Sequence, residues 1–323
     1  MEGCMIRNII FDTDIGGDSD DVMALDLLMS AHRAGECRLT GVTYSADVPY
    51  SPALIRSILD YYSFQDVPVG RAPFREEHKP RTKDCYAKPV ADVFGGADAP
   101  TYETTPDAVK LLRRLLVENG KSTLVVTGWL TNVADLLTSQ PDEISPLTGI
   151  ELVRSCVDEI AVMGGNFSHQ DASTPFRTQP DENGDLRPIA EWNIYADIPA
   201  AQRVFEVCPV PLSVIPFSLG LNMISGGPMV KAGGENRPDS YSFIVHESLN
   251  GRHSWDPATA LYAVYGTKPW FYRSAPGKVT ITDEGISHFD ASRGGNCRLL
   301  GCAMEKAAIA AAMDEIVMNG LYK

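Results

Sequence analysis

Short apolar segments alternate with amphipathic segments along most of the chain, and this alternation limits the folds that it can form. We predict strands over residues 6–11, 37–45, 67–70, 122–128, 157–165 and 211–220. We predict helices over residues 21–36, 51–64, 105–120, 131–141 and 197–207, with Ser51 and Thr105 as caps. Strands joined through helices lie parallel and follow right-handed crossovers. The chain is therefore predicted to be an α/β protein with a mostly parallel sheet.

The remaining segments have less regular patterns. Residues 71–105 and 166–189 are rich in loop-forming residues, and we predict long loops there. Such loops are often functional lids, which is the role we consider for 71–105. The C-terminal third is predicted to be mainly helical, with some strand near 277–290. No repeat and no clear linker divides the chain, so residues 1–323 are predicted to form one domain.

The charge balance limits the partners of the chain. Its 42 acidic residues exceed its 28 basic residues, which gives a formal net charge of −14. This argues against binding to nucleic acid or to an anionic membrane surface, because both are negatively charged. Seven scattered cysteines form no CxxC pair, and the N-terminal apolar run is too short for a signal peptide or a membrane span. We therefore expect reduced thiols and a cytoplasmic location.

Five aspartates crowd into FDTDIGGDSDDVMAL, the segment between the first strand and the first helix. They are Asp12, Asp14, Asp18, Asp20 and Asp21. Helix capping accounts for one or two of them, but closely spaced carboxylates repel unless a cation lies between them. The segment has glycines but no lysine, which disfavours a phosphate loop, and Met23 stands where an EF-hand loop has its glutamate. Clustered carboxylates favour calcium or magnesium over zinc.

Further polar residues follow other predicted strands. Asp47 follows the second strand, Thr127–Asn132 follow a middle strand, and Met163–Asn166 follow a later one. Ligands of open α/β sheets bind beyond the carboxyl ends of the strands. We therefore expect these residues to lie near the aspartates.

Five motifs, in the same order, resemble those of the inosine-uridine preferring nucleoside hydrolase family. They are DTDIGGDSDDVMAL (12–25), VTGWLTNVADLL (126–137), AVMGGNF (161–167), AEWNIYADIPAAQRVF (190–205) and SWDPATALYAV (254–264). The first motif differs from the common family pattern DxDPGxDDxxAL by two extra residues before the paired aspartates, as in one branch of the family. The motifs span most of the chain, and their shared order makes the resemblance specific.

The resemblance implies a doubly wound α/β fold, one bound calcium ion and hydrolysis of the N-glycosidic bond of a ribonucleoside. The metal ligands that it implies are Asp14, Asp21, Asp256 and the backbone carbonyl of Thr127. The residues that it implies for binding ribose hydroxyls are Asp20, Glu191 and Asn193. Many members of the family are dimers or tetramers, so a homodimer or homotetramer is also implied.

These roles agree with the chemistry of the reaction. Cleavage of the C1′–N bond passes through an oxocarbenium-like state, which neighbouring carboxylates stabilise. A calcium-bound water has a lowered pKa, and a carboxylate beside it can accept its proton. We predict that Asp14 is this base, and that ribose hydroxyls complete the calcium shell and fix the sugar.

The predicted substrate pocket departs from the family pattern. Trp255 stands where many members have a histidine that protonates the leaving base. The purine-specific branch also has tryptophan here, so we predict that Trp255 stacks on a purine, with solvent as the proton source and His253 as an alternative acid. Asp185 and Asp47 stand near positions where many members have asparagine, and both are predicted to contact substrate. Asp185 has an equal alternative as a loop-tip residue, because the segment 166–189 is longer than the resemblance implies. Asn166 is also predicted to contact substrate.

Three residues are predicted to support the site rather than to contact substrate: Asp12 orients the aspartate-rich turn, Asn132 shapes a helix N-terminus and Trp129 is a packing residue. Asp18 lies on the expanded bend and is either an extra acid near the metal or a solvated residue, of which we favour the solvated one.

Two alternative functions remain open from the sequence. The first is hydrolysis of another N- or O-glycoside at the same metal site, which the changes at Asp47 and Asp185 motivate. The second is a non-catalytic, calcium-dependent protein that binds sugars or nucleosides, which the loss of the usual histidine motivates. The retained carboxylates argue against a binding protein, because binding alone does not require a water-activating acid.

Overall fold

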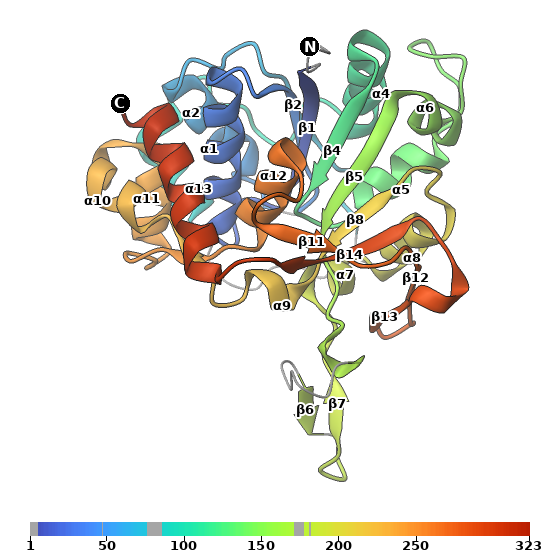
Figure 1. Cartoon of the computed structure of the whole chain (residues 1–323). Helices are drawn as coiled ribbons and strands as arrows, with labels where there is room; N and C mark the ends of the chain where they lie inside the picture. The colour runs from blue at the N-terminus through green and yellow to red at the C-terminus, as the bar shows by residue number, and fades with distance from the viewer. Residues whose placement is uncertain (1–5, 47, 76–85, 171–177, 181) are drawn as a thin grey trace, which may run out of the picture.

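The computed structural model contains a central eight-stranded sheet with helices on both faces (Figure 1). It describes residues 6–46, 48–75, 86–170, 178–180 and 182–323. The sheet consists of β1 (Arg7–Thr13), β2 (Cys37–Tyr44), β3 (Val69–Arg71), β4 (Ser122–Val126), β5 (Val157–Met163), β8 (Leu212–Ile215), β11 (Phe271–Arg273) and β14 (Cys297–Cys302). Their order across the sheet is β11-β14-β8-β5-β4-β1-β2-β3, and every neighbouring pair is parallel except β11 with β14. The chain winds outward from β1 in both directions, which confirms the predicted doubly wound fold.

Helices and short hairpins surround this sheet. The helices are α1 (Asp20–Arg33), α2 (Ser51–Tyr61), α3 (Ala87–Phe94), α4 (Ala108–Asn119), α5 (Thr131–Thr138), α6 (Gly149–Cys156), α7 (Trp192–Ala196), α8 (Ile198–Val207), α9 (Phe217–Gly220), α10 (Gly227–Gly233), α11 (Pro238–Val245), α12 (Trp255–Tyr265) and α13 (Lys306–Leu321). The hairpins are β6 (Thr178–Pro180) with β7 (Leu186–Pro188), β9 (Ile224–Ser225) with β10 (Arg252–His253), and β12 (Lys278–Ile281) with β13 (Ser287–Asp290).

Each face of the sheet carries its own apolar core. Side chains alternate along a strand, so Ile9 and Phe11 of β1 enter one core and Ile10 enters the other. The first core includes α1, α12 and α13, and the second includes α4, α5 and α8. Because both faces are covered, the central strands are apolar without interruption, which explains why they were readily predicted.

Several elements differ from the predictions. Strands β11 and β14 were missed, although both join the main sheet, whereas the predicted strand near 277–290 forms the separate β12–β13 hairpin. Helix α6 was also missed, and α3 lies within the predicted loop 71–105. The predicted strand 211–220 ends at Ile215, because Pro216 precedes the short helix α9.

The predicted caps Ser51 and Thr105 are also wrong. The cap of α4 is Asp107, two residues after Thr105. Its side chain accepts the N–H of Lys110 at 2.9 Å. Ser51 lies inside α2, and its hydroxyl donates to the carbonyl of Ile15. This bond ties α2 to the aspartate-rich turn.

Two findings concern the general properties of the chain. Among the described residues, no helix is both long and apolar enough to cross a membrane. The five cysteines within the described ranges carry free thiols.

The end of β4 crosses the aspartate-rich turn at Gly128. A Cβ atom at this position would lie 2.6 Å from the backbone nitrogen of Asp14 and 2.6 Å from the backbone carbon of Thr13. Those atoms belong to a strand packed on both faces, so they have little room to move. Only glycine allows this approach.

Gly128→Ala is therefore expected to lower the free energy of unfolding by about 2 kcal/mol, within the range for overpacking a tight interior. Denaturant titration measures this change. Gly164→Ala is the control at the end of β5, because the nearest atom to its added Cβ lies 3.4 Å away, in ordinary contact. Equal stability of the two variants would contradict the close approach described for Gly128.

Candidate metal and substrate site

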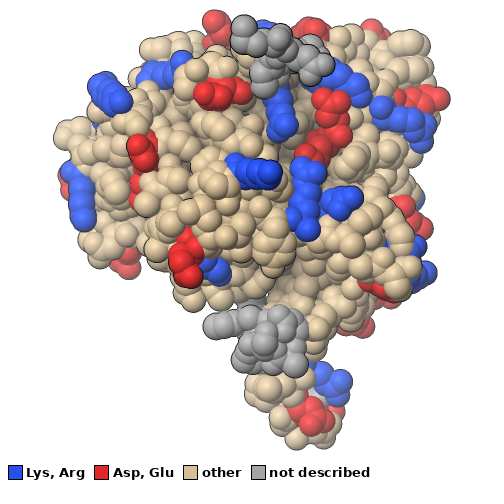
Figure 2. Space-filling model, in the orientation of Figure 1, with Lys and Arg blue, Asp and Glu red and all other residues tan. Residues whose placement is uncertain are grey.

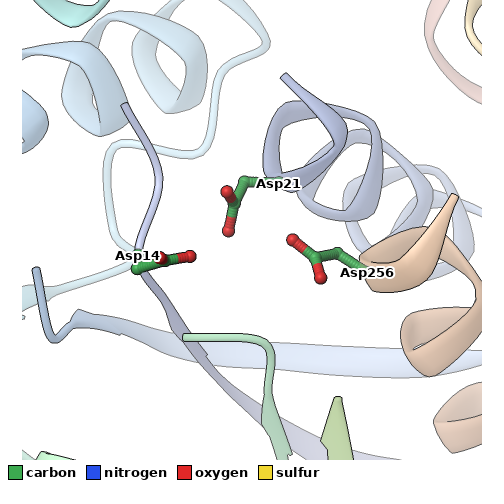
Figure 3. A group of neighbouring side chains, drawn as sticks. All are labelled: Asp14, Asp21 and Asp256. Carbon is green, nitrogen blue, oxygen red and sulfur yellow. The ribbon is translucent and has the colours of Figure 1, made fainter. Parts of the chain in front are cut away.

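Three buried aspartates from distant parts of the chain meet at the carboxyl end of the sheet. Asp14 follows β1, Asp21 lies in the first turn of α1, and Asp256 lies in the first turn of α12. One oxygen of each carboxylate lies within 4.8 Å of those of the other two. Figure 3 shows the three side chains pointing toward a common centre. Within the described ranges, no other group of three or more acidic, histidine or cysteine side chains is close enough to share a metal ion.

The electrostatics of this group favour a cation. Burial raises the pKa of Asp256 and of Asp20 well above the ordinary range, and neighbouring carboxylates raise both further. Burial also raises the pKa of Asp12 to about 7, against the hydrogen bonds that it accepts. Such a cluster stays ionised only where positive charge compensates it. The donors are hard oxygen atoms, so the group fits calcium or magnesium rather than zinc.

Thr127 lies against this cluster at the end of β4. Its hydroxyl lies 3.4 Å from the carboxylate of Asp21, and its backbone N–H donates to the carbonyl of Asp12 at 2.7 Å. Its own carbonyl oxygen, a predicted metal ligand, accepts a hydrogen bond from Asn193 Nδ2 at 2.8 Å. A carbonyl oxygen has two lone pairs, so this bond leaves one for a cation.

Asp20 connects the two helices that carry metal-binding candidates. Its Oδ2 accepts the backbone N–H groups of Trp255 at 3.0 Å and of Asp256 at 3.2 Å. These groups begin α12 and have no partner within that helix, so Asp20 satisfies them from outside. Asp20 therefore sets the position of Asp256, and its predicted contact with ribose would use the other oxygen.

Glu191 and Asn193 join the site through the backbone around it. Glu191 caps α7, with Oε1 accepting the N–H of Asn193 at 3.0 Å and Oε2 accepting that of Ile194 at 3.3 Å. The same Oε2 accepts the N–H of Gly165 at 3.2 Å. These bonds fix α7 against the ends of β4 and β5. Both side chains are buried there, and Asn193 reaches the cluster through its hydrogen bond to the Thr127 carbonyl.

Asn166 has a different environment from the one expected. Its amide nitrogen donates to the carbonyl of Ile189 at 3.1 Å, and its Oδ1 accepts the N–H of Ser168 at 3.2 Å. The hydroxyl of Ser168 also donates to this oxygen. The amide of Asn166 is thus used to hold the loop after β5.

Asp12, Asn132 and Trp129 have the supporting positions predicted for them. Asn132 Nδ2 donates to Asp12 at 2.7 Å and to the carbonyl of Tyr44 at 3.2 Å. The hydroxyl of Thr43 also donates to Asp12. These bonds connect β1, β2 and α5 behind the metal-binding candidates, and Trp129 is fully buried.

Asp18 is not a solvated residue, so that prediction is wrong. Arg252 donates from Nε to Asp18 Oδ1 at 2.8 Å and from Nη2 to Asp18 Oδ2 at 2.6 Å. Burial raises the pKa of Asp18, but the hydrogen bonds and charge of Arg252 outweigh it, so the pKa lies below the ordinary value. Arg252 was not singled out from the sequence, because no motif links two residues 234 positions apart.

Trp255 lies in a small apolar cluster with Met163, Phe217 and Leu221. Its ring stacks on that of Phe217 with 5.2 Å between centroids, and its indole N–H donates to the Phe217 carbonyl at 2.8 Å. The residue is only 9 % exposed. In this conformation a nucleobase could contact only part of the ring, so extended stacking on Trp255 requires neighbours to shift.

His253 lies beside this cluster, with its ring centroid 5.1 Å from that of Trp255. Its Nδ1 accepts the backbone N–H of Asn222 at 2.9 Å, so in the neutral ring the proton lies on Nε2. Burial lowers the pKa of His253, and the nearby charge of Arg252 lowers it further. The neutral form is therefore favoured near pH 7.

One predicted substrate contact, Asp185, is not brought to the aspartates. Asp185 is exposed and immediately precedes β7, near the turn of the β6–β7 hairpin. This hairpin follows β5 and projects away from the body of the molecule (Figure 1), and the space-filling view shows it standing clear of the surface around it (Figure 2). This position agrees with the alternative in which Asp185 is a loop-tip residue. Asp47 lies outside the described residues.

The family model described as inosine-uridine preferring nucleoside hydrolase matches residues 9–299. The chain belongs to this family. The family resemblance found in the motifs is thereby confirmed.

Curated relatives of this nucleoside hydrolase family member match it over a shorter region. The pyrimidine-specific ribonucleoside hydrolase RihA of Klebsiella pneumoniae is 29% identical over 212 residues, which covers 62% of this chain and 58% of that protein. RihA of Enterobacter sp. is 31% identical over 212 residues, covering 62% of this chain and 57% of that protein. The chain thus spans a little over half the length of these relatives.

Solved structures share the fold over nearly the whole chain. The inosine-uridine preferring nucleoside hydrolase from Bacillus anthracis has a TM-score of 0.69 and 18% identity, covering 97% of this chain and 99% of that one. The type III effector protein XopQ, solved in complex with adenosine diphosphate ribose, has a TM-score of 0.67 and 16% identity, covering 98% and 94%. At these identities the likeness shows a shared fold.

The raised pKa values predict how this family member responds to calcium and pH. Without a cation, the folded chain keeps Asp20 and Asp256 protonated at pH values where the unfolded chain has already released these protons. Stability is therefore expected to fall as pH rises. For Asp12 the fall extends from the ordinary pKa of 3.8 to the raised pKa of about 7. Calcium replaces these protons, so the rise in melting temperature on adding calcium is expected to be larger at about pH 8 than at about pH 5. Thermal melts with and without calcium measure this, and an equal rise at both pH values would contradict it.

Proposed function

We propose that this protein hydrolyses the N-glycosidic bond of ribonucleosides with a bound divalent cation, for which calcium is our choice. The observation that carries this proposal is the convergence of Asp14, Asp21 and Asp256, buried together at the carboxyl end of the sheet. Membership of the nucleoside hydrolase family supports the reaction type. Calcium takes about six to eight oxygen ligands, so the three carboxylates and the Thr127 carbonyl leave positions for water and ribose hydroxyls.

The residues around the cluster have distinct roles in this reaction. A cation held by the carboxylates would lower the pKa of a neighbouring water and orient the ribose. Asp14 accepts the proton of the attacking water as the C1′–O bond forms. The C1′–N bond breaks at the same centre, its electron pair leaves with the base, and the surrounding carboxylates stabilise the positive charge on the sugar.

The leaving base requires a proton, and Trp255 cannot provide it. Its indole N–H has no useful acidity and already donates to Phe217. His253 carries its proton on Nε2 near the apolar cluster and is the alternative donor within the chain. Protonation by solvent is our proposal, because the favoured neutral state of His253 leaves little imidazolium at neutral pH.

Charge favours nucleosides over nucleotides as substrates. Asp14, Asp21 and Asp256 are buried together, and the buried carboxylates of Asp12 and Asp20 lie close enough to interact with them electrostatically. A single divalent cation offsets only part of this negative charge, so a phosphate group on the ribose would be repelled. We therefore propose that a neutral nucleoside is the substrate.

Asp14→Asn is expected to lower kcat by about 10²- to 10⁴-fold, because the variant keeps the shape of the side chain but loses the base. Asp21→Asn is expected to lose calcium affinity as well, which isothermal titration with calcium measures. Asp98→Asn, at an exposed position on a loop, is the control and should keep both properties. Unchanged calcium affinity in Asp21→Asn would refute its role as a ligand.

Purine preference is a further proposal, based on Trp255 and the small apolar cluster that it forms with Met163 and Phe217. Release of ribose from inosine, adenosine, guanosine, uridine and cytidine tests it together with the reaction itself. Trp255→Ala is expected to reduce kcat/KM several-fold more for inosine than for uridine, since base stacking contributes about 1–3 kcal/mol when fully formed and less on a partly covered ring. Equal losses on both would count against contact between the base and Trp255.

The same assays separate the two alternatives. Turnover of another glycoside but of none of the five nucleosides would favour a different glycoside hydrolase. Tight binding of a nucleoside in isothermal titration, with no release of ribose at any enzyme concentration, would favour a binding protein.

A further inference from the structure

An ion pair joins the aspartate-rich turn to the segment that leads into α12. Arg252 contacts both carboxylate oxygens of Asp18 through two different nitrogen atoms, at 2.8 and 2.6 Å. The two side chains are 33% and 27% exposed, so the pair is partly shielded from solvent. Bidentate pairs of this kind are more directional and stronger than single contacts between mobile surface charges.

Arg252 is fixed by the hairpin to which it belongs. It lies opposite Ser225 in the β9–β10 pairing, and the hydroxyls of Ser225 and Ser254 lie 2.7 Å apart. Its guanidinium carbon lies 5.7 Å from the centroid of the Trp255 ring. Helix α12 begins at Trp255, three residues after Arg252, so a shift of Arg252 is transmitted directly to Asp256.

The turn around Asp18 is fixed from a second side. The Tyr86 hydroxyl accepts the N–H of Gly16 at 3.1 Å and donates to the carbonyl of Asp18 at 2.8 Å. Ser19 donates its N–H to Asp18 Oδ1 at 2.7 Å, and its hydroxyl lies 3.3 Å from His246 Nδ1. Asp18 is therefore a fixed point on the turn rather than the end of a mobile side chain.

We propose that the Asp18–Arg252 ion pair is a positioning brace: it holds the start of α12 so that Asp256 stays close to Asp14 and Asp21. Two chain segments supply these three carboxylates. Asp20 joins the segments in the interior, and the brace joins them a second time near the surface. It belongs to the two-residue expansion of the aspartate motif, which supplies Asp18. The effect of the brace on calcium affinity rests on the proposed function, whereas its effect on the position of α12 does not.

Backbone hydrogen exchange in calcium-free protein tests the position of α12. Asp18→Asn and Arg252→Gln each remove the ion pair, and both are expected to speed exchange in the segment 252–258. Asp142→Asn is the matched control, because Arg113 contacts both of its oxygens at 2.9 Å in a bidentate pair on the side of the sheet where α4 packs. This control should leave exchange in 252–258 unchanged. Unchanged exchange in both brace variants, or equal acceleration in the control, would overturn the proposal.

Isothermal titration with calcium tests the consequence for the site. Loss of a residue that orients a metal ligand typically weakens metal binding by about 10- to 100-fold. We expect calcium affinity to fall by about tenfold in each single brace variant. The double variant should bind calcium as tightly as either single variant, because both changes remove the same interaction. Arg252→Lys keeps the charge and should recover part of the affinity, whereas Asp142→Asn should match the parent protein.

The outcomes separate the brace from the proposed function. Additive losses in the double variant, or no recovery with Arg252→Lys, would overturn the brace. If the parent protein binds calcium without hydrolysing any nucleoside, the proposed function fails. Hydrogen exchange and calcium titration of the variants then still decide for or against the brace. If the parent protein binds no calcium, the proposed function also fails, and hydrogen exchange alone decides for or against the brace.

Discussion

Repulsion among buried carboxylates is the constraint on which the rest of this structure depends. Asp14, Asp21 and Asp256 lie where each raises the cost of ionising the others. Neutral donors reduce this cost without removing it: the Thr13 hydroxyl donates to Asp21, and the N-terminal turns of α1 and α12 supply favourable dipoles. The remaining cost would be offset by a bound cation. The fold thus brings the three carboxylates together at a cost in stability that protons or a cation can reduce.

The sheet topology explains why these residues can meet. The chain winds outward from β1 in both directions, so the loops after β1, β4 and β5 open at the same edge. Glycine at 128 lets the end of β4 touch the backbone of the aspartate-rich turn. Helix α12 then enters from far along the sequence and is capped by Asp20. Tight backbone contacts, rather than long flexible side chains, therefore define the geometry of the site.

The sequence was informative where a local pattern carries the signal. Strands buried on both faces leave apolar runs in the sequence, and amphipathic helices leave periodic patterns. The ordered motifs located Asp14, Asp21 and Asp256 together. It failed where the signal is not local. Strand β11 is only three residues long, and the pair between Asp18 and Arg252 connects residues 234 positions apart. The sequence left two positions open for Asp185, in the pocket or at a loop tip, because a motif counted back from Glu191 does not show that the β6–β7 hairpin carries this residue outward.

The place of Asp256 in the chain has a consequence for biosynthesis. The first two carboxylates are made within the first 21 residues, but the third is made only in the last quarter of the 323 residues. A growing chain therefore lacks the complete set of three carboxylates throughout most of its synthesis. A cation that needs all three would be bound only after α12 has been made and has packed against α1, which makes binding a late step of folding.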